Sequence, residues 1–129
     1  MVTKNFLNQI MGNVFGTKKT PPLPTKYFLG LSKSAPNVDG TGVTEPTGGG
    51  YTRMELTMMS EPTDGVIDNQ EGIMFPVSTD DWGTVTHYVI YDASGNVLQA
   101  NQLKKPRAVQ SDIQFYFKPH ALKISLLGD

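Results

Sequence analysis

The stretch Thr84–Asp92, TVTHYVIYD, decides the fold class of this chain of 129 residues. One side of the stretch carries Val85, His87, Val89 and Tyr91, and the other carries Thr86, Tyr88 and Ile90. An alternation of this kind, rich in β-branched and aromatic residues, is typical of a β-strand. Because both sides are largely apolar, we expect the strand to lie in the centre of a sheet.

The residues that follow predict a hairpin. In DASGN, residues 92–96, an aspartate opens the turn and Gly95 can adopt a positive φ angle. The next segment, NVLQANQL at residues 96–103, returns as the partner strand. KKPR, residues 104–107, is interpreted as the turn that ends it.

Five further segments carry strand patterns, which gives about seven strands with turn residues between them. They are residues 25–32, 51–59, 72–77, 112–118 and 121–127. A turn is expected at residues 61–65, and residues 34–50 form one long loop rich in glycine and proline. The pattern predicts a mainly β fold, an antiparallel β-sandwich of immunoglobulin-like or jelly-roll-like type with one short N-terminal α-helix.

The N-terminal helix is predicted from an apolar stripe at helical spacing. The stripe comprises Phe6, Leu7, Ile10, Met11, Val14 and Phe15. Thr3 or Asn5 can cap its start, and Gly16 stands where a left-handed residue commonly ends a helix. We expect the stripe to dock on the body or on a partner subunit, because a helix this short is marginal alone in water.

A proline-rich arm, residues 17–24, separates this helix from the strands. The expected domain organisation is therefore a docking helix with its arm at residues 1–24 and a β-sandwich domain at residues 25–129.

The composition argues against several kinds of bond, binding site and partner. The chain has no cysteine, so disulfides and thiolate metal sites are excluded. Its 11 basic and 12 acidic residues nearly balance, which gives no reason to expect nucleic acid as a partner. We read no signal peptide and no membrane-spanning segment.

The glycine triplet Gly48–Gly50, followed by Tyr51, could in principle cradle a phosphate. A phosphate-binding loop would lead into a helix, whereas here an alternating strand pattern follows. We therefore interpret Gly48, Gly49, Gly50 and Tyr51 as a structural junction between loop and strand, where the backbone packs closely.

No set of residues predicts catalysis. His87 and His120 lack the neighbouring ligands of a zinc site, and we interpret both as structural or surface residues. Asp80 and Asp81 are adjacent and make a poor catalytic pair, so Trp82 beside them is expected to anchor the core. We expect no enzyme activity, no metal and no cofactor.

Four methionines are interpreted as residues that fill an irregular core or a subunit contact, with the core as the default. They are Met54, Met58, Met59 and Met74.

Several short motifs together resemble a family of small virion proteins of tailed bacteriophages, often labelled phage tail fibre-like proteins. The motifs are Leu29-Gly30-Leu31-Ser32, Ala35-Pro36, Glu45, Gly48-Gly49-Gly50-Tyr51 with Arg53, Phe75-Pro76, Trp82-Gly83, Val85-Thr86-His87, and Asp92-Ala93 with Gly95. The similarity spans roughly residues 5–127 and is looser over residues 99–117.

This resemblance implies a structural protein of the virion, without enzyme activity, built of repeated copies. Tail- or fibre-associated assembly through subunit contacts is the first hypothesis, with other virion proteins as partners and a homo-oligomer in the particle. A capsid-decoration or neck (head-fibre) protein is the alternative. A carbohydrate-binding adhesin that recognises a host surface glycan would need Trp82, Tyr88 and Tyr91 to line one open groove.

Overall fold

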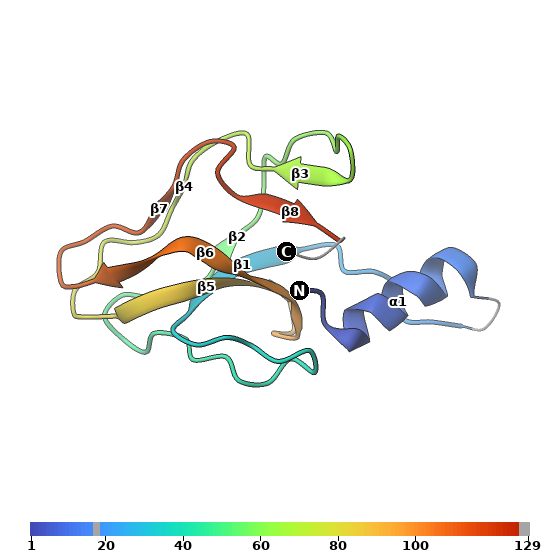
Figure 1. Ribbon diagram of the computed structural model, residues 1–129, viewed down its shortest axis with the longest axis horizontal. Coiled ribbons are helices and arrows are strands. Elements are labelled where there is room, and N and C mark those ends of the chain that lie inside the picture. Colours follow the sequence, from blue (N-terminus) through green and yellow to red (C-terminus); the bar gives the residue numbers. More distant parts are fainter. Residues whose placement is uncertain (17–18, 127–129) are drawn as a thin grey trace.

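The computed structural model describes residues 1–16 and 19–126, which form one helix and eight strands (Figure 1). The elements are α1 (Lys4–Phe15), β1 (Tyr27–Ser32), β2 (Met54–Glu55), β3 (Val66–Asp68), β4 (Ile73–Met74), β5 (Gly83–Asp92), β6 (Val97–Val109), β7 (Tyr116–Phe117) and β8 (Lys123–Ser125). All strand pairs are antiparallel, which confirms the predicted mainly β fold with one short N-terminal helix.

One four-stranded sheet, in the order β2-β1-β5-β6, forms the larger layer. Two separate two-stranded sheets, β4-β7 and β3-β8, lie above it in Figure 1, and α1 extends from the right-hand end of the molecule. β5 lies between β1 and β6, as its two apolar faces predict.

The hairpin between β5 and β6 forms as its sequence predicts. The Asp92 carboxylate accepts hydrogen bonds from the backbone N–H groups of Ser94 and Asn96, each at 2.9 Å. Gly95 takes a φ angle of +86°, which a residue with a side chain adopts only with strain. The turn therefore brings the two longest strands together, and their ladder continues the pairing.

β6 differs from the prediction, because residues 104–107 continue the strand and do not form a turn. The strand register shows why. His87 pairs with Gln102 and Val85 pairs with Arg107, so five residues of β6 span the distance that two residues of β5 span. The extra residues bulge out of the ladder. β6 is an edge strand, and Pro106, which has no N–H to donate, is tolerated there.

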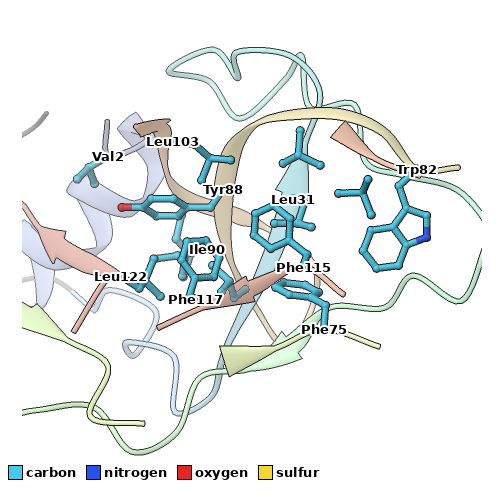
Figure 2. Packing of buried hydrophobic residues seen from close by; sticks show 14 of the residues in the cluster. Val2, Leu31, Phe75, Trp82, Tyr88, Ile90, Leu103, Phe115, Phe117 and Leu122 are labelled. Atoms are coloured by element: carbon cyan, nitrogen blue, oxygen red, sulfur yellow. The ribbon is translucent and has the colours of Figure 1, made fainter. Parts of the chain in front are cut away.

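The core fills the space between the large sheet and the two small ones (Figure 2). Phe75, Phe115 and Phe117 come from the small sheets and their flanks and pack edge to face in series. Tyr88 of β5 meets Phe117 with ring centroids 6.2 Å apart. Trp82 is buried at the end of this row, which agrees with its expected role as a core anchor.

The shorter strands differ from their predicted lengths. The segment 51–59 is strand at Met54–Glu55 alone, because Tyr51 turns into the core and Met58 takes a φ angle of +55° that no strand allows. The segments 112–118 and 121–127 shorten to β7 and β8, and Leu127 lies outside the described residues. β3 was not predicted, since three residues are too few to show a period.

The methionines split into two groups. Met54 packs against the core, as predicted. Met58 and Met74 are more than half exposed, so the default interpretation of these two as core residues is wrong, and a subunit contact stays a prediction. The unbranched methionine side chain tolerates either setting, which makes its pattern a weak guide to burial.

Candidate functional site

The start of α1 is tied to the body by Thr3. Its hydroxyl accepts a hydrogen bond from the Phe6 N–H at 3.4 Å, which confirms Thr3 as the N-cap. The same hydroxyl donates to the carbonyls of Val97 and Leu98 in β6, at 3.0 and 3.2 Å. Because one buried side chain makes all these bonds, the first turn of the helix is fixed against the sheet.

The predicted stripe on α1 divides into a covered and an exposed part. Phe6 is buried in the core of its own chain, and Ile10 packs against that core. The remaining four residues are exposed: Leu7 by 41%, Met11 by 53%, Val14 by 60% and Phe15 by 73%. We call Leu7, Met11, Val14 and Phe15 the exposed helix face. Exposure rises toward the C-terminal end of the helix, which lies farthest from the sheet (Figure 1).

Gly16 ends the helix in a different way from that predicted. Its φ and ψ angles, −72° and 145°, are extended and not left-handed. Its N–H bonds to the Gly12 carbonyl at 3.1 Å, and a Cβ atom at residue 16 would lie 2.5 Å from that oxygen. Glycine is needed here for the close approach of two backbones, not for a positive φ angle.

The described part of the proline-rich arm runs back beside the helix. The side chains of Gln9 and Asn13 donate to the carbonyls of Pro22 and Pro21, at 2.6 and 2.8 Å. The carbonyls of Pro21 and Pro22 lie outside the sheets, and the side-chain amides of Asn13 and Gln9 supply their hydrogen bonds. Helix and arm therefore form one hydrogen-bonded unit that presents the exposed helix face.

The glycine triplet lies against Trp82. All three glycines have positive φ angles, of 70°, 60° and 80°. The Gly49 carbonyl accepts hydrogen bonds from the Trp82 indole N–H at 2.8 Å and from the Thr79 N–H at 2.9 Å. A Cβ atom on Gly49 would lie 2.9 Å from the indole nitrogen. These contacts fit the predicted structural junction, because they pack the Gly49 backbone closely against Trp82.

Tyr51, next to the triplet, joins β1 to the long loop. Its hydroxyl donates to the Glu45 carboxylate at 2.6 Å and accepts from the Leu31 N–H at 2.9 Å. Arg53 donates to both oxygens of the same carboxylate, at 3.0 and 2.7 Å, and its guanidinium lies 3.6 Å from the centre of the Tyr91 ring. We call Glu45, Tyr51, Arg53 and Tyr91 the polar latch.

The latch has a defined charge state. Burial raises the pKa of Glu45, but hydrogen bonds from Arg53 and Tyr51 outweigh it and hold that pKa below its ordinary value of 4.5. Burial, followed by the Glu45 charge, raises the pKa of Tyr91. Glu45 is therefore a carboxylate and Tyr91 a neutral phenol near neutral pH, which keeps the ion pair between Glu45 and Arg53 intact.

The residues considered as catalytic candidates each contact a side chain or a backbone group of their own chain. The His87 ring contacts the Thr86 hydroxyl at 2.8 Å, and His120 lies 3.1 Å from the Asp68 carboxylate. Asp80 and Asp81 each accept a nearby backbone N–H in the turn before β5. Within residues 1–16 and 19–126, no group of three or more acidic or histidine side chains is placed to hold a metal ion.

The three aromatic residues that an adhesin would require do not line a common open groove. Trp82, Tyr88 and Tyr91 are all buried, with 2%, 6% and 2% of their surface exposed. Sugar-stacking aromatic faces need to be open to the ligand, so this arrangement does not support the adhesin hypothesis.

Two buried polar residues with structural roles were missed in the sequence. Asn69 donates to the carbonyls of Glu71 and Lys118 and accepts from the Leu122 N–H. Ser78 links residues 110 and 113 in a similar way. Neither stands in a recognisable pattern, because all their partners except Glu71 lie more than 30 residues away along the chain.

In the described part of the chain, no helix has the length and apolar character needed to cross a bilayer. Among curated proteins, none matches the sequence. A family model described as Podophage GP4 fiber I protein gp80 matches residues 2–125, nearly the whole chain. The match covers the helix, the polar latch and all eight strands, and on this ground the chain belongs to that family of phage fibre proteins.

Proposed function

We propose that this protein is a non-enzymatic structural component of a phage fibre that joins the virion by packing its exposed helix face against a neighbouring subunit. Membership of a podophage fibre family supports the structural role in the virion. The partners are other virion proteins, including further copies of this chain in a homo-oligomer.

The observation that carries the proposal is the exposed helix face itself. Four large apolar side chains follow one another on one side of α1 and increase in exposure away from the sheet. Contiguous apolar surface of this kind commonly marks an interaction site. A helix of 12 residues draws most of its stability from packing, and α1 packs on its own chain chiefly through Phe6 and Ile10.

The layout supports a docking module of residues 1–24 beside a β domain of residues 25–129. The hydrogen bonds from Gln9 and Asn13 to the arm hold helix and arm together. The module is anchored by Val2 and Phe6, which pack into the same core as the aromatic residues of the β domain, and the exposed helix face takes no part in that core. A partner could therefore cover the exposed helix face without repacking the sheets.

Incorporation into virions tests the proposal. A phage encoding the double variant Val14→Asp with Phe15→Asp is grown, and purified particles are assayed for the protein by quantitative immunoblotting. Buried carboxylates at a docking surface are strongly unfavourable, so we expect the variant to be lost from the particles. Val77→Asp with Ile113→Asp, at two exposed apolar residues outside the helix, is the control and should be incorporated normally.

Normal incorporation of the helix variant would contradict docking through this face. The position on the particle is tested separately, by imaging virions that carry an epitope tag at the C-terminus of the chain. Label on the tail or on fibres supports the first hypothesis. Label over the capsid or at the neck would favour the alternative of a decoration or head-fibre protein.

A further inference from the structure

An open groove of about 740 Å³ lies beside the edge strand β6. One wall is β6 from Asn101 to Lys105 with Arg107, and the other is formed by Lys123 and Ser125 of β8 with His120. Tyr88, Leu103 and Phe117 are buried beneath it. None of the residues lining the groove belongs to α1, so the groove is separate from the exposed helix face.

The groove is cationic. Lys104, Lys105 and Arg107 line one wall, and no carboxylate stands among the described residues that line it. Asp68, just outside, is paired with His120 at 3.1 Å and with Lys123 at 3.5 Å. In the described part of the chain, no carboxylate forms an ion pair with Lys104 or Lys105. These two lysines are therefore available to an anionic partner.

Arg107 is held in a fixed orientation at the end of this wall. It donates to the Tyr116 carbonyl at 2.8 Å, and its guanidinium lies 4.8 Å from the centre of the Phe115 ring. The bulge of β6 between Gln102 and Arg107 carries both lysines away from the ladder with β5.

The edge of β6 already accepts an extended segment next to the groove. Residues 1–3 pair antiparallel with it through a bridge between Val2 and Gln99. The Thr3 N–H donates to the Leu98 carbonyl at 3.0 Å, and the Ala100 N–H donates to the Met1 carbonyl at 2.9 Å. The groove begins at Asn101, where this pairing stops. A second extended segment could continue the same ladder along β6.

We propose that the groove binds an extended acidic segment of another polypeptide, which pairs with the edge of β6 and places carboxylates against Lys104 and Lys105. Lysines and a proline on an edge strand discourage pairing with apolar strands, and they leave an acidic strand as the favoured partner. The proposal goes beyond the role of the exposed helix face and does not depend on it.

A designed peptide tests this inference with the purified full chain. The probe is a fluorescein-labelled peptide of about eight residues that alternates Glu and Val, measured by fluorescence anisotropy. We expect saturable binding that weakens as salt is raised. The double variant Lys104→Glu with Lys105→Glu should lose about tenfold in affinity, whereas Lys19→Glu with Lys26→Glu, the same charge change at exposed lysines elsewhere, should bind as the parent does.

Two further probes separate strand pairing from simple charge attraction. The same peptide with alternate backbone amides methylated cannot complete a ladder and should bind much more weakly. Equal binding of the methylated peptide, failure of the parent peptide to bind, or equal affinity of the two double variants would each overturn the proposal. Binding of heparin in place of the peptide would also overturn it, because it would assign the groove to a sulfated glycan. Circular dichroism confirms that each variant is folded.

Discussion

Arg53 and Glu45 face each other across the glycine triplet and share two hydrogen bonds, Nε to Oε2 at 3.0 Å and Nη2 to Oε1 at 2.7 Å. Glu45 precedes the triplet and Arg53 follows it, so the pair closes the segment into a loop. A paired contact of this geometry fixes orientation as well as distance. The loop in turn holds Tyr51 in the core and Gly49 against Trp82.

Glu45→Gln should lower the free energy of unfolding by about 1–3 kcal/mol, because a neutral amide leaves a partly buried guanidinium without its charge partner. Urea denaturation of the parent and the variant measures the difference. Glu55→Gln, at an exposed position on β2, is the matched control and should change stability by no more than about 0.5 kcal/mol. Equal effects of the two substitutions would show that the latch contributes nothing specific.

Acid should destabilise the fold through Glu45. Its pKa is lower in the folded protein than its ordinary value of 4.5, so its contribution is complete above that pH and is lost as the pH falls through the folded pKa. The pKa of Asp92 is lowered as well: burial raises it, but hydrogen bonds from Asn96 outweigh that effect. Thermal melts from pH 7 to pH 3 should show a fall in Tm below about pH 4.5. The fall should be shallower in Glu45→Gln.

Gly49→Ala should destabilise the protein more than Gly48→Ala. Both substitutions place a side chain at a positive φ angle, which costs about 1–2 kcal/mol. A Cβ atom at residue 48 meets nothing within 4 Å, whereas one at residue 49 meets the Trp82 indole at 2.9 Å. Chemical denaturation compares the two. Trp82 fluorescence should shift in Gly49→Ala alone, and an unchanged spectrum would argue against the contact.

Truncation of the two phenylalanines of α1 should affect stability very differently. Phe6→Ala removes a buried ring and should lower the free energy of unfolding by about 3 kcal/mol. Phe15→Ala removes a ring that is 73% exposed and should change it by less than about 0.5 kcal/mol in the isolated chain. Thermal melts of dilute protein test both. A large effect of Phe15→Ala would mean that the ring is already covered.

Asn69→Ala should cost about 1–3 kcal/mol, because it leaves the buried Leu122 N–H without its acceptor and removes a donor from the carbonyls of Glu71 and Lys118. Asn13→Ala removes two side-chain hydrogen bonds at the surface, where water replaces them, and should cost less than about 1 kcal/mol. Urea denaturation distinguishes the two variants. Similar costs would indicate that water reaches Asn69.

The family match includes the segments that earlier carried the resemblance, from Leu29 to Gly95. The structure gives the residues of these segments physical roles. Gly30, for example, packs so closely under the polar latch that a Cβ atom there would lie 2.7 Å from the Tyr91 ring. The spacing of Glu45, the triplet and Arg53 could have indicated the latch in advance, since a loop closed by a short ion pair brings its ends together.

What the sequence by itself determined was local: the alternation of β5, the hairpin at Asp92–Asn96, and the apolar stripe of α1 with a cap at Thr3 or Asn5, each encoded by residues close together in the chain. Tertiary structure alone decided how long β6 runs, which methionines are buried, and which part of the stripe remains exposed. It also brought Asn69 to Lys118 and Lys104 to the groove beside β8. These features depend on contacts between distant segments, and a linear pattern holds no signal for a partner that only folding supplies.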